Sequence, residues 1–292
     1  MFQNTNLTPK QKRRGNRSSV SCDIITITSG KGGVGKSTIS SNLAISLQKM
    51  KKKVLLIDAD IHLGNLDLIL GMRTQYTIAD VVSEGMPLDK VIVEGPAGLH
   101  ILPASSASLE LLEMEDVALK KLAAAFEDFT TRYEYILVDT GAGIAPSVIT
   151  FLLGADKIVL VITPDPASIS DAYAVIKVIR SVNKTVPILL TANKVSTPEE
   201  GDVLYKKMNL MTQKFLKSRL IFGGSILRDD IIAQSVRRRS PFMLDYPNTT
   251  AAKAISILNR RLLQVPVVER HPDTNFFNRL VSGRKIQFEW NL

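Results

Sequence analysis

The chain has 292 residues, 45% of them hydrophobic, which is enough to bury the core of one large α/β domain. Its 37 Lys and Arg against 28 Asp and Glu give a formal net charge of +9, which favours a polyanionic partner, either nucleic acid or an anionic bilayer. Its single cysteine, Cys22, excludes an intramolecular disulfide framework, and the sequence shows neither a membrane-spanning apolar run nor an apolar signal core, so we expect a cytoplasmic protein.

The chain divides by composition into three parts. Residues 1–22 are polar and basic and predict a disordered N-terminal arm. Residues 23–263 predict the folded domain, and residues 264–292 predict a linker and tail. Basic residues gather in the arm and in two further groups, around Lys51 and around Arg238, each of which is a solvated surface by default.

A glycine-rich segment follows the first expected strand, Ile24 to Thr28, and leads into a helical pattern from Ile39 to Met50. This order is the context of a phosphate-binding loop, in which backbone N–H groups and the helix N-terminus face the phosphates. Lys36 is expected at the β- and γ-phosphates, and the Ser37 hydroxyl at Mg²⁺. The candidate nucleotide-binding residues are Gly30, Lys31, Gly32, Gly33, Val34, Gly35, Lys36, Ser37 and Thr38.

The same glycines also satisfy the GxGxxG pattern of a dinucleotide-binding fold, with Asp58 at the place of the ribose carboxylate. An NAD-dependent dehydrogenase is therefore the remote alternative. A pyrophosphate held by backbone amides has no need for a lysine and hydroxyl pair at the helix start, whereas a triphosphate with Mg²⁺ needs both. The loop chemistry favours a nucleoside triphosphate.

Short apolar runs alternate with longer helical patterns along the rest of the domain. This alternation predicts an α/β fold: a mostly parallel, twisted sheet covered by helices on both faces. Ser168 is a candidate helix cap. Further strands are expected at Val54–Ile57, Leu99–Leu102, Tyr135–Val138, Lys157–Ile162, Ile188–Ala192 and Leu220–Ser225, and helices at Ile78–Val82, Leu109–Phe129, Ile169–Val182, Val203–Leu216 and Thr249–Leu263.

Acidic residues end two of these strands. Asp58 and Asp60 close one, and Asp139 closes another. Because the carboxyl ends of parallel strands line the ligand crevice, we expect all three near the phosphate loop, with Asp139 holding a metal-bound water. Gly141 and Gly143 would let a backbone amide approach the γ-phosphate, so residues 139–145 are expected to sense the nucleotide.

The base is predicted from the end of another strand. Asn193 and Lys194 are similar to the start of the NKxD box that reads guanine in GTPases, but Ser196 stands where that box has its aspartate. A hydroxyl is a poor replacement for a carboxylate that accepts two hydrogen bonds from guanine. Adenine is therefore favoured, with Asn193 as its reader.

The segment GKGGVGKS resembles the deviant Walker A motif of the MinD/ParA ATPases, and the resemblance spans roughly residues 23–263. It implies a P-loop NTPase fold of the MinD (SIMIBI) type, an ATPase with ATP and Mg²⁺ as cofactors, and a homodimer when ATP is bound. By this resemblance Lys31 reaches across the dimer to the partner's phosphates, and Asp60 positions the hydrolytic water. Ser37 is then the direct metal ligand, with Asp58 and Asp139 in the Mg²⁺ shell.

The stretch Asp58–Asp67 resembles the first switch of MinD-type ATPases. Two further stretches, Asp139–Ile144 and Thr163–Ile179, resemble the FlhG branch of that family, also called FleN or YlxH, which regulates flagellar number and placement. The resemblance implies a slow ATPase switch that acts with flagellar assembly proteins. Residues 1–22 contain no DQAxxLR-type element, through which many FlhG proteins stimulate FlhF, so regulation of FlhF stays open. A cell-division or DNA-partition ATPase is the alternative, although the DPQ typical of partition ATPases is absent.

The tail contains a short apolar pattern at helical spacing: Phe276, Phe277, Leu280 and Val281, flanked by basic residues. This pattern is typical of a helix that lies on an anionic membrane surface. It predicts peripheral association with the inner face of the cell membrane. A C-terminal helix docked on the body is the alternative.

Overall fold

The computed structural model describes residues 22–60, 66–76, 80–81, 84–103, 124, 126, 132–268 and 278–280. The predicted N-terminal arm, except Cys22, lies outside these residues, as does most of the helices expected at Ile78–Val82 and Leu109–Phe129. The domain boundaries expected from composition therefore remain predictions.

The predicted mostly parallel sheet is confirmed. Eight strands are arranged in the order β3-β4-β2-β5-β1-β6-β7-β8, and within this sheet the β3–β4 pair is antiparallel whereas the other neighbours are parallel. The short edge strand β3 has no counterpart among the predicted strands. The strands are β1 (Asp23–Ser29), β2 (Val54–Ala59), β3 (Val93–Glu94), β4 (His100–Leu102), β5 (Tyr135–Ala142), β6 (Lys157–Ile162), β7 (Ile188–Val195) and β8 (Ile221–Leu227).

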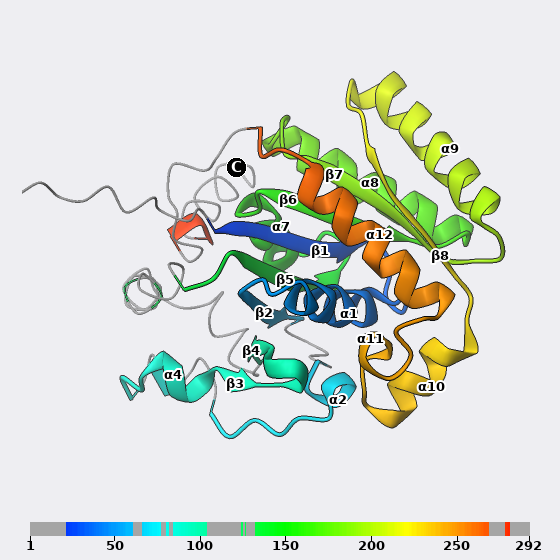
Figure 1. Cartoon of the computed structure of the whole chain (residues 1–292). Helices are drawn as coiled ribbons and strands as arrows, with labels where there is room; N and C mark the ends of the chain where they lie inside the picture. Colours follow the sequence, from blue (N-terminus) through cyan, green and yellow to red (C-terminus); the bar gives the residue numbers. More distant parts are fainter. Residues whose placement is uncertain are drawn as a thin grey trace, which may run out of the picture.

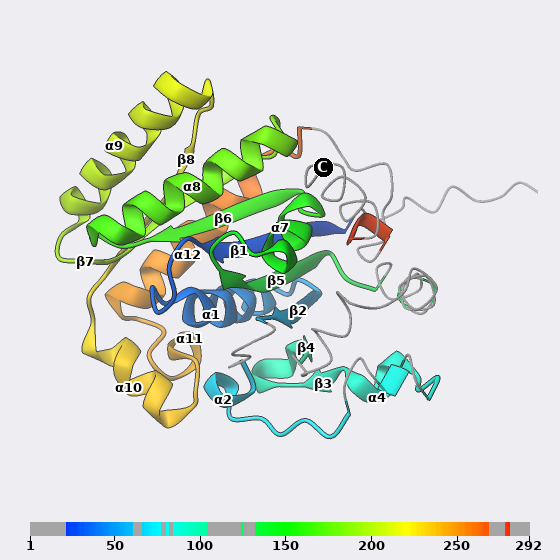
Figure 2. The same ribbon diagram turned by 180° about the vertical axis from the view of Figure 1, so that it is seen from behind.

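Helices cover both faces of this sheet (Figures 1 and 2). Figure 1 looks onto α1 (Lys36–Lys49) and α12 (Thr250–Gln264), which pack on each other and on short α11 (Phe242–Asp245). The opposite face carries α7 (Pro146–Leu153), α8 (Pro166–Val182) and α9 (Pro198–Leu216). Each face has its own cluster of buried aliphatic side chains, so the sheet is sealed on both sides.

Smaller elements lie around the ends of the sheet. They are α2 (Leu66–Leu70), α4 (Leu88–Val91), the 3₁₀ turn η1 (Pro96–Gly98) and α10 (Asp230–Arg238). Sequence patterning missed α7 and α10, which have only 8 and 9 residues and so show few helical repeats.

The predicted cap of α8 is wrong. Asp165 is the N-cap residue, because its side chain accepts a hydrogen bond from the Ala167 N–H. Ser168 lies inside the helix, and its buried Oγ accepts the Thr163 N–H, which fixes the turn between β6 and α8. The helix therefore begins a few residues earlier than the sequence pattern indicated.

The described part of the tail, residues 278–280, is docked on the body beside the start of β1 (Figure 1). Leu280 is 5% exposed and belongs to an apolar cluster with Ile24 and Phe151. Arg279 is 3% exposed, forms an ion pair with Asp156 at 2.9 Å and donates to the Gly154 carbonyl. The expectation of an exposed, membrane-facing Leu280 is thus corrected for this conformation. Phe276, Phe277 and Val281 lie outside the described residues.

Candidate nucleotide site

A cavity of about 1410 Å³ opens at the carboxyl ends of the strands. Its walls come from the glycine-rich loop, the ends of β2, β5 and β7, and the segment between β8 and α10. This is the crevice at which ligands bind in parallel α/β sheets. Among the predicted site residues it is lined by Gly32, Gly33, Gly35, Lys36, Ser37, Thr38, Asp60, Gly141 and Asn193.

Other predicted residues belong to the loop but do not line the cavity. Val34 is 4% exposed and packs into the core between α1 and the sheet. A Cβ on Gly30 would lie 2.3 Å from the backbone carbon of Asp171, so only glycine fits between this loop and α8. These two residues shape the loop from outside.

The loop backbone has the form of an anion cradle. Gly33 and Gly35 have positive φ angles of 74° and 93°, a conformation that favours glycine. Gly35 is also the N-cap of α1 and provides no side-chain hydrogen bond to the first turn. The N–H groups of that turn, which have no intrahelical acceptor, are therefore left for phosphate oxygens.

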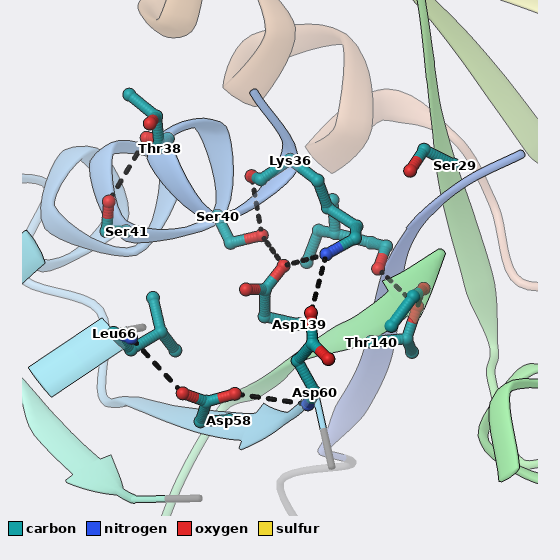
Figure 3. A network of polar contacts seen from close by, with 12 residues as sticks. Ser29, Lys36, Thr38, Ser40, Ser41, Asp58, Asp60, Leu66, Asp139 and Thr140 are labelled. Atoms are coloured by element: carbon teal, nitrogen blue, oxygen red, sulfur yellow. Dashed lines mark hydrogen bonds and ion pairs between the residues drawn. The ribbon is translucent and has the colours of Figure 1, made fainter. Parts of the chain in front are cut away.

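Two carboxylates hold the Lys36 ammonium in place (Figure 3). Its Nζ lies 3.6 Å from Asp139 Oδ1 and 3.9 Å from Asp60 Oδ2. The register of the sheet explains this arrangement, because Asp58 of β2 pairs directly with Asp139 of β5, which brings the two acidic strand ends together. Lys36 is only 7% exposed, so its charge is directed into the site and not to solvent.

Asp139 fits the expected role in a magnesium shell. Its Oδ1 accepts a 2.8 Å hydrogen bond from Ser40 Oγ, while its Oδ2 is buried without a hydrogen-bond partner among the described residues. Burial raises the pKa of Asp139, and the charge of Lys36 and the hydroxyls of Ser37 and Ser40 act against that rise. A carboxylate oxygen beside a P-loop serine is a donor set suited to hydrated Mg²⁺.

Asp58 does not line the cavity. Its two carboxylate oxygens accept the N–H groups of Asp60 at 3.1 Å and of Leu66 at 3.2 Å (Figure 3). Burial, followed by the nearby charge of Asp139, raises the pKa of Asp58 to about 7. In this conformation Asp58 shapes the segment that carries Asp60, and its contribution to a magnesium shell remains a proposal.

The raised pKa of Asp58 predicts a pH-dependent stability. Between its ordinary pKa of 3.8 and about 7 the folded protein keeps a proton that the unfolded chain has released, so the free energy of unfolding falls as the pH rises. Three pKa units correspond to about 4 kcal/mol. We expect Asp58→Asn to flatten the dependence measured by urea unfolding from pH 4 to 7, whereas the exposed Asp230→Asn leaves it unchanged. An unaltered slope for Asp58→Asn would contradict the assignment.

The end of β7 contacts the loop through two side chains. Asn193 Nδ2 donates to the Val34 carbonyl at 2.7 Å, and Lys194 Nζ donates to the Gly33 carbonyl at 2.7 Å. The amide nitrogen of Asn193 is thus used by the loop, and its Oδ1 is the atom left to accept from a base. An acceptor at this place can receive the exocyclic amine of adenine, and Asn193 as the reader of adenine stays a prediction.

The segment after β8 contributes cavity residues that were not predicted from the sequence. Arg228, Asp229 and Asp230 line the cavity on the side of Asn193. Arg228 Nε donates to the Lys194 carbonyl, and Asp229 caps α10 through the Ile231 N–H. Asp229 before an amphipathic run was the available sequence signal for the start of α10, but no motif marked this segment as part of a nucleotide site.

In the predicted nucleotide sensor, residues 139–145, Gly143 does not line the cavity. Gly143 has a φ of 88° and its N–H donates to the Ser29 carbonyl at 2.8 Å. The amide is therefore held by β1 in this conformation. Gly141 does line the cavity, and a Cβ there would approach Asp60 Oδ1 at 3.6 Å.

Lys31 does not line the cavity. Its Nζ forms an ion pair with Asp165, with the two side chains 42% and 43% exposed. The hydrogen bond between them raises the pKa of Lys31 and lowers that of Asp165. Lys31 is therefore held at the surface beside α8, whereas Lys36 lies in the site.

The family model described as "AAA domain" matches residues 22–192. The antiactivator FleN of Pseudomonas aeruginosa is 33% identical over 244 residues, covering 84% of this chain and 87% of FleN. The flagellum site-determining protein YlxH of Helicobacter pylori is 37% identical over 268 residues, covering 89% of this chain and 90% of YlxH. A chain of the MinC:MinD cell division protein complex of Aquifex aeolicus has a TM-score of 0.66 and 32% identity, over 85% of this chain and 98% of that one.

The chain belongs to the MinD/ParA family of P-loop ATPases. This confirms the resemblance found in the deviant Walker A motif, and the relatives of the chain include the antiactivator FleN and the flagellum site-determining protein YlxH. ATP hydrolysis is the activity of the MinD/ParA fold, so the glycines serve a phosphate loop and the dehydrogenase interpretation is set aside.

Proposed function

We propose that this MinD/ParA ATPase is a slow switch that regulates flagellar number or placement. In the proposed cycle the ATP-bound protein is a homodimer on the membrane, and the ADP-bound protein is a monomer in solution. The similarity to the flagellum site-determining protein YlxH supports the flagellar role. FlhF or another flagellar assembly protein is the proposed downstream partner.

The exposed position of Lys31 is the observation that supports dimerisation most directly. Its ammonium is paired with Asp165 at the surface, outside the cavity in which Lys36 is buried. A second lysine that does not serve its own nucleotide is available to the phosphates of a second protomer. Exchange of Asp165 for a phosphate would replace one charged hydrogen bond by another, at little net cost.

The residues of the site fit ATP with Mg²⁺. Gly32, Gly33 and Gly35 would hold the phosphates through backbone N–H groups, Ser37 would bind the metal directly, and Asp139 would hold its water. The bound metal neutralises charge on the transferred phosphoryl group. Asp60 faces the cavity beside Lys36, where its carboxylate can orient a water molecule towards the γ-phosphate.

Membrane binding is proposed to depend on release of the tail. No helix among the described residues is long and apolar enough to span a bilayer. The docked turn around Leu280 hides one of the four apolar residues expected to insert, so the conformation described here presents an incomplete membrane helix. One short helix binds at about the 10⁴ M⁻¹ of a single acyl chain, and two tails on one dimer add about 10² to 10⁴ in avidity.

Weakening the docked tail should therefore increase membrane binding without ATP. Arg279→Ala leaves buried Asp156 without its ion-pair partner, which destabilises the docked state. We expect about tenfold more protein to co-sediment with anionic phospholipid vesicles, although the variant has one positive charge fewer. The matched control is Arg260→Ala, which removes an exposed arginine from α12. Unchanged sedimentation of Arg279→Ala would contradict the proposal.

A DNA-partition or cell-division role is the second candidate, favoured by the net charge and by the exposed arginines 237–239 at the end of α10. Parallel assays with anionic vesicles and duplex DNA separate the two. Phosphate-mediated DNA binding should fall steeply with salt and survive removal of residues 276–292. Vesicle binding that is lost with those residues supports the membrane switch.

A further inference from the structure

The last residues of β7 form an unusual contact with the phosphate loop. The pairing of β7 with β8 shifts its register between Asn193 and Val195, and Lys194 at the bulge has a left-handed φ of 57°. A bulge redirects the side chain of the residue that forms it. Here it turns the Lys194 ammonium back over the loop, to the carbonyl of Gly33.

The two contacts from β7 hold consecutive carbonyl groups of the loop. Lys194 holds the oxygen of Gly33, and Asn193 holds the oxygen of Val34. In a trans peptide the C=O of one residue and the N–H of the next point in opposite directions. Drawing these two oxygens towards β7 therefore turns the N–H groups of Val34 and Gly35 the other way, towards the phosphate side of the loop.

We propose that Lys194 is a positioning residue of the ATPase: through the Gly33 carbonyl it orients the Val34 N–H for phosphate binding and so sets the rate at which nucleotide leaves. The proposal rests on nucleotide binding at this loop. In this proposal Lys194 acts on the phosphates and not on the base, although its neighbour Asn193 is the predicted reader of the base.

The geometry separates this role from a structural one. Lys194 is exposed, and its backbone is held independently, because Arg228 Nε donates to its carbonyl at 3.0 Å and the flanking Val195 is buried in the core. Replacing the side chain therefore removes the contact to Gly33 without disturbing the strand. Lys194→Met keeps the aliphatic length, and Lys194→Arg keeps a charged donor that can reach the same carbonyl.

The test compares ligands with and without phosphates. Stopped-flow release of a fluorescent ADP analogue should be about tenfold faster from Lys194→Met, the loss expected for one charge-assisted hydrogen bond, and close to the parental rate from Lys194→Arg. The affinity for adenosine, which lacks phosphates, should not change. The matched control is Lys207→Met, which removes an exposed lysine from α9.

A second readout needs no nucleotide. In the nucleotide-free protein the amide hydrogens of residues 33–35 should exchange faster in Lys194→Met than in the parent or the control. Equal losses of ADP and adenosine affinity would place Lys194 at the base and overturn the proposal, as would unchanged release and exchange. A parent protein that binds no nucleotide would contradict the proposed function, and the exchange measurement would still test the loop.

Discussion

Lys36→Ala should abolish measurable binding of ATP and ADP. The substitution removes the buried positive charge of the site and leaves two carboxylates without their counter-charge: Asp60, which lines the cavity, and Asp139, which is buried. The lost attraction to the phosphates and the repulsion from the remaining carboxylates act together. We expect the affinity to fall by about 10² to 10⁴, since removing one partner of a buried charge pair costs roughly 3–5 kcal/mol. Isothermal titration calorimetry with Mg·ATP measures the change.

The same substitution also affects the folded state without nucleotide. Asp139 is 1% exposed, and without Lys36 its charged form has no counter-ion within 4 Å among the described residues. A loss of stability is expected, so unfolding by urea is measured in parallel. Lys36→Met, which fills more of the space, serves as a second variant. A folded Lys36 variant with parental affinity would contradict the assigned role.

Asp60→Ala should leave nucleotide binding in place and slow ATP hydrolysis by at least about 10²-fold, the contribution of a positioned acid or base to catalysis. Asp60 lines the cavity, whereas Asp58 is occupied with backbone N–H groups and Asp139 is buried behind Lys36. Among these three carboxylates, Asp60 is therefore the one able to meet an incoming water. Single-turnover release of phosphate measures the rate.

The control for this prediction is Asp230→Ala, which removes another carboxylate from the lining of the same cavity. It changes the local charge equally but should leave hydrolysis within a few-fold of the parent. Parental hydrolysis by the folded Asp60→Ala protein would show that another group orients the water.

The strands and the phosphate loop were predictable because each has a local signal. β2 and β6 are buried along their whole length and so appear as continuous apolar runs. The loop is recognisable from its glycines, because positions such as Gly35 have a positive φ angle that favours glycine. Placement of Asp58, Asp60 and Asp139 near one another followed from the rule that parallel strands end on one side.

Other features depend on contacts between distant segments and have no local signal. The carboxylates around Lys36 are set by the β2–β5 register, and the contact from Lys194 to Gly33 depends on a bulge in β7. Whether the tail binds a membrane or docks on the body could not be predicted either, because an apolar face at helical spacing suits a membrane and a protein core alike. The burial of Leu280 and the buried pair of Arg279 and Asp156 show that residues 278–280 are docked in this conformation.

The proposed switch requires that ATP, bound at this loop, joins two copies of the chain through Lys31. Light scattering coupled to size exclusion, applied to Asp60→Ala with Mg·ATP, measures this association while slow hydrolysis preserves the complex. We expect twice the monomer mass of 32.1 kDa with ATP, the monomer mass with ADP, and the monomer mass with ATP when Lys31→Ala is added. A monomer in the presence of saturating ATP, with binding verified by calorimetry, would contradict it.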